Sequence, residues 1–404
     1  MKILFLTDNF PPEVNAPASR TYDHVREWHK AGHEVTVITC APNFPKGRVY
    51  EGYKNKLYQT EWMDGIKVVR VWSYIAANKG FLKRTLDYIS YSVTSFLAGL
   101  FQKTDIIIAT SPQLFTALSG RTLAFWKRKP WIMEVRDLWP ESIKTVGAMS
   151  DNVFIRYFEW EEMRCYRSAR KIVVVTDSFK RTLTARGVPA EKIEVVKNGA
   201  NRELFKPMPK DEALAERLGL KGKRVIGYIG THGLAHKLDF ILQCAKNMQG
   251  KNDYHFLFIG AGAEKERLLK MRNTEHIDNV TMLDPVPKTE VWRYISILDL
   301  CLINLKKSPL STTVIPSKIF ENAGMEIPII MGVEGEAKDI IDSYGAGLCF
   351  EPENEADFND KLDKLLADDA LYEKCKEGCR ALSNDFDRKV LAAKMLKVIE
   401  NTIE

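Results

Sequence analysis

Short apolar runs rich in Ile and Val recur along the whole chain, and polar positions do not alternate within them. Such runs are typical of strands that are buried on both faces of a parallel sheet. Segments of helix length lie between most of the runs, and this order predicts an α/β fold. The predicted strands are Ile3–Leu6, Val35–Thr39, Val68–Val71, Ile106–Ala109, Trp131–Val135, Ile172–Val175, Val225–Ile229, His255–Ile259, Val280–Leu283, Leu300–Leu305, Pro328–Met331 and Leu348–Phe350.

The strand–helix pattern runs twice. The segment 198–210 contains Asn-Gly and two prolines and is typical of a linker. We therefore expect two Rossmann-like parallel-sheet domains, 1–200 and 201–385, facing across a cleft, with a C-terminal helix in 386–404 that packs back on the first domain. Ligands of such sheets bind beyond the carboxyl ends of the strands.

Composition and charge narrow the class of protein. Of 404 residues, 45% are hydrophobic and 28% are charged, which excludes a disordered or fibrous chain. Seven scattered cysteines and a short apolar run at the start predict a cytoplasmic protein. The net charge of +6 divides into +10 for residues 1–200 and −4 for residues 201–404. The basic half suits anionic lipid, diphosphate or nucleic acid, or is only an uneven solvated surface.

The loops of the second domain carry two glycine turns. Gly230 ends a predicted strand and Gly233 follows in the turn, while Gly260 and Gly262 follow the next strand. Glycine permits close approach of a ligand, and a helix N-terminus favours phosphate, although an ordinary strand–helix turn has the same pattern. His232 and His236 are four residues apart, as in the zinc-binding motif HExxH, but Gly233 stands where that motif has its catalytic glutamate. His236 and Lys237 are therefore better candidates for anion contacts.

The segment VIPSKIFENAGMEIPII is the most informative one. Ser317 is a candidate N-cap behind Pro316, and Lys318 adds a cation beside the helix amides. A diphosphate could be held there without metal. Glu321, one turn along, could bind a ribose diol through both oxygens, or it could simply pair with a lysine on the surface.

The first domain has two candidate loops. Asn15 and Ala16 precede a predicted helix that starts near Pro17, and Arg20 lies one turn further. In WIMEVRDLWPES, charged residues directly follow a buried strand. They could bind a ligand, or they could form an ordinary salt-bridged loop. These residues are Arg136, Asp137 and Glu141.

The segment 79–103 is basic at its start and then aromatic and aliphatic. It could lie on a membrane surface with Lys79, Lys83 and Arg84 towards the headgroups. A core helix is slightly favoured, because the apolar positions cover more than one stripe.

The ordered set of these motifs resembles glycosyltransferase family 4, which has the GT-B fold. The motifs are the PPE loop, VRDLWPES, KIVVVTDSFK, GVPAEKIEVVKNGANRELFKP, VIGYIGTHG, FLFIGAG and PSKIFENAGMEIPII. Within this family, the chain is similar to the branch that builds bacterial O-antigen and capsule repeats, including N-acetylfucosamine (L-FucNAc) transferases. The likeness covers nearly the whole chain.

This resemblance implies a retaining, metal-independent transfer of a sugar, such as an N-acetylated deoxyhexose, from a UDP-sugar. The resemblance also implies that this transfer needs no cofactor. The acceptor would be an undecaprenyl-diphosphate-linked saccharide, with peripheral contact at the cytoplasmic face of the inner membrane and no nucleic acid partner. By position, the donor would be bound by Asn15, Ala16, Arg20, Gly230, Thr231, His236, Lys237, Gly260, Gly262, Val286, Pro287, Ser317, Lys318 and Glu321, with Arg136, Asp137 and Glu141 as catalytic candidates.

The chain departs from the family pattern at several positions. Thr313 stands where the first glutamate of the E-x7-E motif is expected, and Thr231 and His236 replace an arginine and a lysine. Two alternatives remain open: a nucleotide-sugar epimerase or hydrolase in which Asp137 or Glu141 dominates, and a non-catalytic module that binds nucleotide or nucleic acid.

Overall fold

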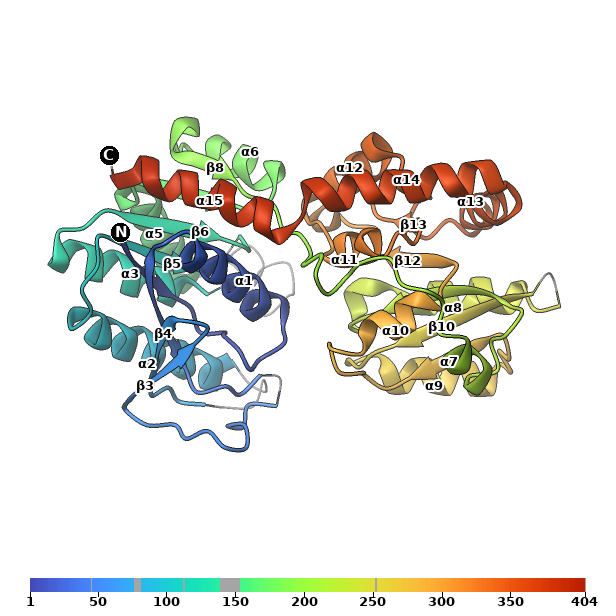
Figure 1. Ribbon diagram of the computed structural model, residues 1–404, viewed down its shortest axis with the longest axis horizontal. Coiled ribbons are helices and arrows are strands. Elements are labelled where there is room, and N and C mark those ends of the chain that lie inside the picture. Colours follow the sequence, from blue (N-terminus) through green and yellow to red (C-terminus); the bar gives the residue numbers. More distant parts are fainter. Residues whose placement is uncertain (45, 76–80, 112, 139–152, 251–252, 404) are drawn as a thin grey trace. The chain divides into compact units, whose positions relative to one another are not determined.

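The computed structural model describes residues 1–404 except 45, 76–80, 112, 139–152, 251–252 and 404. It divides into two compact units, of which the first contains residues 1–198 and 388–404 and the second contains residues 199–387 (Figure 1). The predicted α/β class, with a parallel sheet in each of two units, is confirmed.

The first unit is built on a sheet in the order β3-β4-β2-β1-β5-β6-β7-β8, in which only the edge strand β3 is antiparallel among the described strands. Its elements are β1 Lys2–Leu6, α1 Ala16–Lys30, β2 Glu34–Cys40, β3 Tyr58–Met63, β4 Ile66–Val71, α2 Phe81–Leu100, β5 Ile106–Thr110, α3 Leu114–Lys127, β6 Trp131–Val135, α5 Val153–Ser168, β7 Lys171–Val174, α6 Asp177–Ala185, η1 Ala190–Lys192, β8 Ile193–Val195 and α15 Arg388–Ile403.

The second unit has a parallel sheet in the order β11-β10-β9-β12-β13-β14. Its elements are α7 Glu212–Arg217, β9 Arg224–Ile229, η2 Leu234–His236, α8 Leu238–Asn247, β10 Tyr254–Ile259, α9 Lys265–Thr274, β11 Val280–Leu283, α10 Val291–Ser296, β12 Leu300–Asn304, η3 Leu310–Thr313, α11 Lys318–Gly324, β13 Ile329–Gly332, α12 Glu336–Tyr344, β14 Gly347–Cys349, α13 Glu355–Ala367 and α14 Asp369–Asp385.

The inner strands are mostly apolar because both faces of each sheet are covered there. In β1, Leu4 and Leu6 belong to one hydrophobic cluster, whereas Ile3 and Phe5 belong to the cluster on the other face. Successive side chains of a strand point to opposite faces, so a strand covered on both sides needs apolar residues at every position. The parallel register places the carboxyl ends of these strands at one edge.

The last helix completes the first unit. α15 packs against α1 (Figure 1), and the indole N–H of Trp28 donates to the carbonyl of Ala392 at 2.9 Å. Leu391 and Met395 are buried in the cluster that contains Phe5 and Trp28. The unit therefore combines residues from both ends of the chain.

The predicted core position of segment 79–103 is wrong for one face of α2. Leu86, Ile89, Val93 and Leu97 are between 41% and 53% exposed, although Tyr91 and Ala98 on the same helix are buried. The spacing of three and four residues puts the exposed group on one side of the helix. Among the described residues, no helix combines the length and the apolar composition that a membrane crossing requires.

Candidate functional site

Two glycine turns interlock at the carboxyl edge of the second sheet. The Gly230 N–H donates to the carbonyl of Ile259 at 2.8 Å, and the His232 N–H donates to Ala261 at 2.9 Å. A Cβ on Gly260 would lie 1.8 Å from the Gly230 oxygen, and one on Gly262 would lie 2.2 Å from the His232 oxygen. Only glycine permits these backbones to touch, so the sequence fixes the shape of the turn.

Lys318 crosses this turn from the first residue of α11. A Cβ on Gly230 would lie 2.3 Å from the Lys318 Cε, so the lysine stem covers the glycine. Its Nζ stands 3.7 Å from the centroid of the Tyr228 ring, which is a cation–π contact. Burial lowers the pKa of Lys318 to about 7, although Cys301 and Glu321 act in the opposite direction. The structure gives this ammonium no hydrogen bond or ion pair within the described part of the chain, so it is available to an anion.

Glu321 lies one turn along α11 from Lys318 and is partly exposed. Its carboxylate makes no hydrogen bond or ion pair with any described residue, so it is not engaged by a surface lysine. The expected cap at Ser317 is wrong. The Ser317 backbone is helical (φ −61°, ψ −23°) and its side chain makes no capping hydrogen bond, whereas a capping hydroxyl needs an extended backbone to reach the helix N–H groups.

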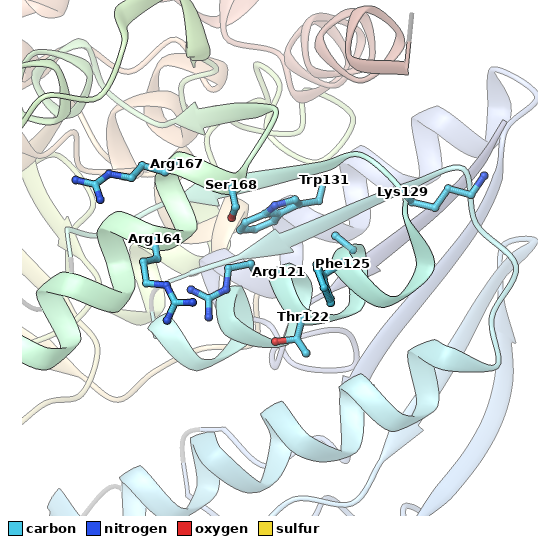
Figure 2. A pocket seen from close by; sticks show the side chains of 9 residues that line it. Arg121, Thr122, Phe125, Lys129, Trp131, Arg164, Arg167 and Ser168 are labelled. Atoms are coloured by element: carbon cyan, nitrogen blue, oxygen red, sulfur yellow. The ribbon is translucent and has the colours of Figure 1, made fainter.

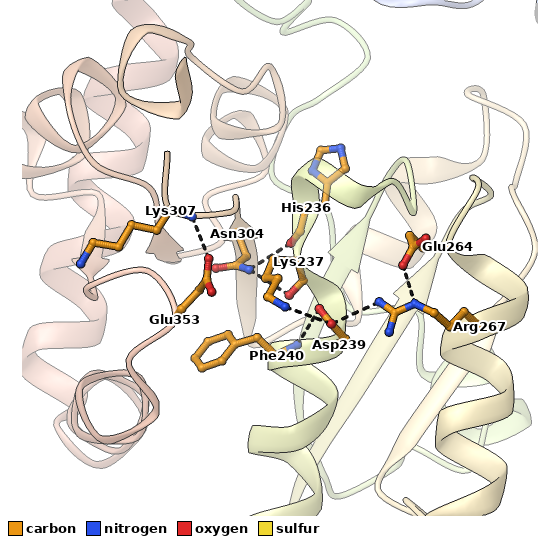
Figure 3. Close-up of polar contacts among 9 residues, drawn as sticks. All are labelled: His236, Lys237, Asp239, Phe240, Glu264, Arg267, Asn304, Lys307 and Glu353. Atoms are coloured by element: carbon orange, nitrogen blue, oxygen red, sulfur yellow. Dashed lines mark hydrogen bonds and ion pairs between the residues drawn. The ribbon is translucent and has the colours of Figure 1, made fainter. Parts of the chain in front are cut away.

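His236 and Lys237 have different surroundings (Figure 3). The Lys237 ammonium lies 3.1 Å from Asp239, which also pairs with Arg267 at 3.2 Å. The His236 ring instead packs edge-on against Tyr228, with 5.8 Å between centroids. Burial and the nearby Lys318 lower the pKa of His236 to about 4, so it is neutral at pH 7. Of the two lysines, Lys237 is thus paired with a carboxylate, whereas Lys318 is not.

Sequence reasoning considered His232 only as a metal ligand and left it out of the candidate site. The side chain is fully buried, and both ring nitrogens lack hydrogen-bond partners among the described residues. Its ring lies 5.9 Å from that of Tyr228, so His232, His236 and Lys318 surround one aromatic ring. The signal was present in the sequence, because glycines at 230, 233, 260 and 262 indicate close packing around residue 232.

The remaining donor candidates of the second unit lie at the same edge of the sheet. Thr231 is exposed beside His232, and the exposed Pro287 and partly exposed Val286 follow β11. In the described residues, no group of three or more His, Cys, Asp or Glu side chains is arranged to hold a metal ion.

In the first unit, the donor role expected for Arg20 requires a correction. Its guanidinium is buried and pairs with the buried Glu134, and it also donates to the carbonyl of Val196 at 3.2 Å. A cation held by a carboxylate inside the unit is not free for phosphate. Asn15 caps α1, because its side-chain oxygen accepts from the Ala18 N–H at 2.9 Å, and Ala16 is the first residue of that helix.

Two of the three catalytic candidates follow β6. Burial and the neighbouring Arg20 lower the pKa of Arg136 to about 10. Its Nε and Nη1 atoms are buried and lack hydrogen-bond partners in the described part of the chain. Asp137 is exposed, and Glu141 lies outside the described residues.

Comparison with known families decides the class of the protein. Residues 15–199 match the family described as glycosyl transferase 4-like domain, and residues 210–381 match glycosyl transferases group 1. The chain belongs to the glycosyltransferases. The epimerase, hydrolase and nucleic-acid alternatives are not favoured, because both matched families are described as glycosyl transferases.

Known proteins resemble this glycosyltransferase over nearly its full length. An Escherichia coli K12 protein, assigned by name to colanic acid biosynthesis as a glycosyl transferase, is 26% identical and covers 88% of this chain and 89% of its own. Sucrose-phosphate synthase from Thermosynechococcus elongatus has a TM-score of 0.77 at 13% identity, covering 99% of this chain and 98% of its own. Anabaena HepE, solved with UDP, has a TM-score of 0.72 at 14% identity, covering 99% and 100%.

A hollow of about 740 Å³ in the first unit lies away from the expected substrate edge (Figure 2). Trp131 at the beginning of β6 and Phe125 from α3 line it, so it lies where strands begin rather than where they end. Two of its arginines, Arg121 and Arg164, pair with Glu161 at 2.8 and 2.9 Å. Substrates of such sheets bind at the opposite edge.

Proposed function

We propose that the glycosyltransferase takes its sugar from a UDP-sugar that is bound by the second unit. The observation that carries this proposal is the Lys318 ammonium, which makes no direct ion pair or hydrogen bond with a described residue and lies across the Gly230 turn. A cation in a site of low polarity binds a diphosphate strongly. The UDP complex of HepE, a protein of the same fold, supports the choice of nucleotide.

The roles of the neighbouring residues follow from their positions. Lys318 and the backbone amides near Ser317 would hold the diphosphate, and Glu321 would accept hydrogen bonds from the two ribose hydroxyls. Gly230, Gly260 and Gly262 would shape the turns against which the nucleotide lies, while Val286 and Pro287 would meet the base. The neutral ring of His236 would donate a hydrogen bond to the nucleotide-sugar, and Thr231 and Lys237 would lie at the edge of the site. Asn15 and Ala16 would contribute backbone only, because the Asn15 side chain caps α1.

We propose that the reaction retains the anomeric configuration and needs no metal. The bond between the sugar C1 and the diphosphate oxygen breaks, and a bond from C1 to the acceptor hydroxyl oxygen forms on the same face. The hydroxyl proton passes to the departing phosphate oxygen. Lys318 would stabilise the negative charge that develops on the leaving group, which is the main way in which preorganised sites lower such barriers. Arg136 and Asp137 are proposed as catalytic residues beside the reacting sugar C1 and acceptor hydroxyl.

The donor is tested by titrating the protein with UDP-, GDP- and TDP-sugars and following thermal stability, since a ligand of the folded state raises it. We expect stabilisation by UDP-sugars, including UDP-L-FucNAc. Glu321→Ala should weaken the binding of UDP-sugar about tenfold to 100-fold, because charged hydrogen bonds to the ribose are lost. Glu373→Ala, an exposed change on α14, is the control. Preference for GDP or TDP, or unchanged affinity of Glu321→Ala, would contradict the donor assignment.

The acceptor is proposed to be an undecaprenyl-diphosphate-linked saccharide in the synthesis of O-antigen or capsule at the cytoplasmic face of the inner membrane. The colanic acid relative supports a role in polysaccharide synthesis. The exposed apolar face of α2, formed by Leu86, Ile89, Val93 and Leu97, supports contact with a membrane. Of the basic residues expected at the headgroups, Lys79 lies outside the described residues, and the exposed Lys83 and Arg84 lie in the first turn of α2. Together with Lys103, Arg128 and Lys129 at the ends of α2 and α3, they would attract anionic headgroups.

Membrane contact predicts cosedimentation with vesicles that contain phosphatidylglycerol. The triple change Ile89→Ser, Val93→Ser and Leu97→Ser should weaken this binding about tenfold or more, because apolar area no longer enters the interface. Val390→Ser, which alters a half-exposed valine on α15, is the matched control. If the triple variant sediments like the wild type, the α2 face does not contact the membrane.

A further inference from the structure

A separate pocket of about 250 Å³ lies at the carboxyl edge of the first sheet. It is bounded by the residues that follow β1 and β2, by the loop before α1 and by the first half of α2. We call it the carboxylate pocket, because three acidic side chains lie in its wall. The residues used below are Asp8, Glu13, Asn43, Phe44, Asp87 and Tyr88.

Glu13 is the unusual member of this wall. Its side chain is only 3% exposed, and its Oε1 accepts from the backbone N–H groups of Asn43 and Phe44 at 2.7 and 2.9 Å. Its Oε2 is buried without a hydrogen-bond partner among the described residues. A buried acceptor without a partner is costly, so native proteins rarely retain one unless another molecule satisfies it. Burial raises the pKa of Glu13, although the N–H groups of Phe44 and Asn43 act in the opposite direction. The free oxygen of Glu13 therefore points to a bound hydrogen-bonding group.

The other acidic groups limit what can bind. Burial and the nearby Asp8 raise the pKa of Asp87 to about 7, so this carboxyl exists in both protonated and ionised forms near neutral pH. Burial also raises the pKa of Asp8. Arg84, a cation in the wall, donates to the Tyr88 hydroxyl at 2.9 Å. An anionic ligand would meet repulsion from those of these carboxyl groups that are ionised, whereas a hydroxyl group can form a hydrogen bond with Glu13 and with Asp87 in either protonation state.

The geometry does not favour a metal ion as the occupant. Three carboxylates could suggest a cation, but within the described residues no three acidic, His or Cys side chains converge as a metal site requires. Phe44 is 41% exposed and, with Tyr88, presents aromatic surface in the same wall. Carboxylates together with aromatic surface suit a ring that carries hydroxyls on its edge and C–H groups on its faces.

We propose that the carboxylate pocket binds an uncharged sugar ring of the acceptor saccharide, with a ring hydroxyl donating to Glu13 Oε2. This inference rests on the proposed function, since it assigns the sugar to the acceptor side of the transfer. Glu13 is then a specificity-determining residue, because it selects a hydroxyl that donates at one position. Loss of that group from the sugar leaves a buried carboxylate oxygen unpaired, which is how polar sites reject close analogues.

The test uses saturation-transfer NMR with the methyl glycosides of glucose, galactose, mannose, N-acetylglucosamine and N-acetylgalactosamine. We expect at least one to bind the wild type, and Glu13→Gln to weaken it about tenfold or more. Glutamine keeps an acceptor oxygen for the two N–H groups and replaces the free oxygen with a donor, so the loop is retained. Glu34→Gln, at the start of β2 where Glu34 pairs with Lys2, is the matched control.

Two results would overturn the pocket assignment: saturation transfer from none of the five sugars, or equal transfer in wild type and Glu13→Gln. Displacement of a bound sugar by Ca²⁺ or Mg²⁺ at the pocket would likewise show a cation site instead. Because this measurement needs no turnover, it stands apart from the donor titration. If UDP-sugars do not bind but the glycoside does, the proposed function fails while the sugar pocket remains.

Discussion

Replacing Lys318 with methionine should lower kcat/KM for the donor sugar by about 10²- to 10³-fold. Methionine keeps the apolar stem that covers Gly230 and Tyr228 but removes the ammonium, which we propose stabilises the departing diphosphate. Losing one preorganised group that stabilises developing charge typically has an effect of this size. The measurement is initial rates at varied UDP-sugar. Lys246→Met is the control, because Lys246, in the last turn of α8, pairs with Glu275, which follows α9.

The pH dependence of donor affinity separates a direct role of Lys318 from a structural one. The free ammonium has a pKa of about 7, so it is charged below pH 7 and increasingly neutral above it. A bound diphosphate favours the charged form, and affinity should therefore fall as the pH rises from 6 to 9, by up to about tenfold per pH unit. Lys318→Met should abolish this slope. An equal slope in wild type and variant would contradict the assignment.

Gly260→Ala should destabilise the second unit by about 3 kcal/mol or more and abolish nucleotide binding. The new Cβ would lie 1.8 Å from the carbonyl oxygen of Gly230, and neither backbone can move without breaking the two turns. Backbone strain at φ +153° adds to the overlap, and such combined effects are among the largest that single substitutions produce. Thermal unfolding followed by UDP titration measures both consequences.

Gly222→Ala is the matched control for this clash. Gly222 also has a positive φ, +77°, but a Cβ there meets nothing within 4 Å. It should cost only about 1 kcal/mol from backbone strain and leave nucleotide affinity unchanged. If Gly260→Ala is no worse than Gly222→Ala, close contact between the two glycine turns is not what holds the site together.

The apolar runs predicted every strand that is buried on both faces, and the structure places a strand at each of them. The same rule missed two strands. Tyr58–Met63 alternates between exposed and half-buried residues, because it is the antiparallel edge of the first sheet. Ile193–Val195 has only three residues and lies at the opposite edge. Edge strands need no continuous apolar run, so a search for buried strands does not find them.

The candidate site was predictable where it depends on local order along the chain and not where it depends on partners distant in sequence. Lys318 and Glu321 follow from the start of one helix. That Arg20 pairs with Glu134, 114 residues further along the chain, is a contact that spacing alone does not reveal. The orphan oxygen of Glu13 is a property of packing, because Asn43 and Phe44, which occupy its other oxygen, lie thirty residues away.

The return of α15 to the first unit has a consequence for synthesis of the chain on the ribosome. Residues 388–403 supply Leu391, Met395 and Ile399 to the cluster around Trp28, and the intervening second unit is made before them. The first unit therefore cannot complete its folding until α15 has been synthesised, and part of its apolar surface stays exposed until then. Chaperones that shield nascent chains should bind this protein longest over the surface that α15 later covers.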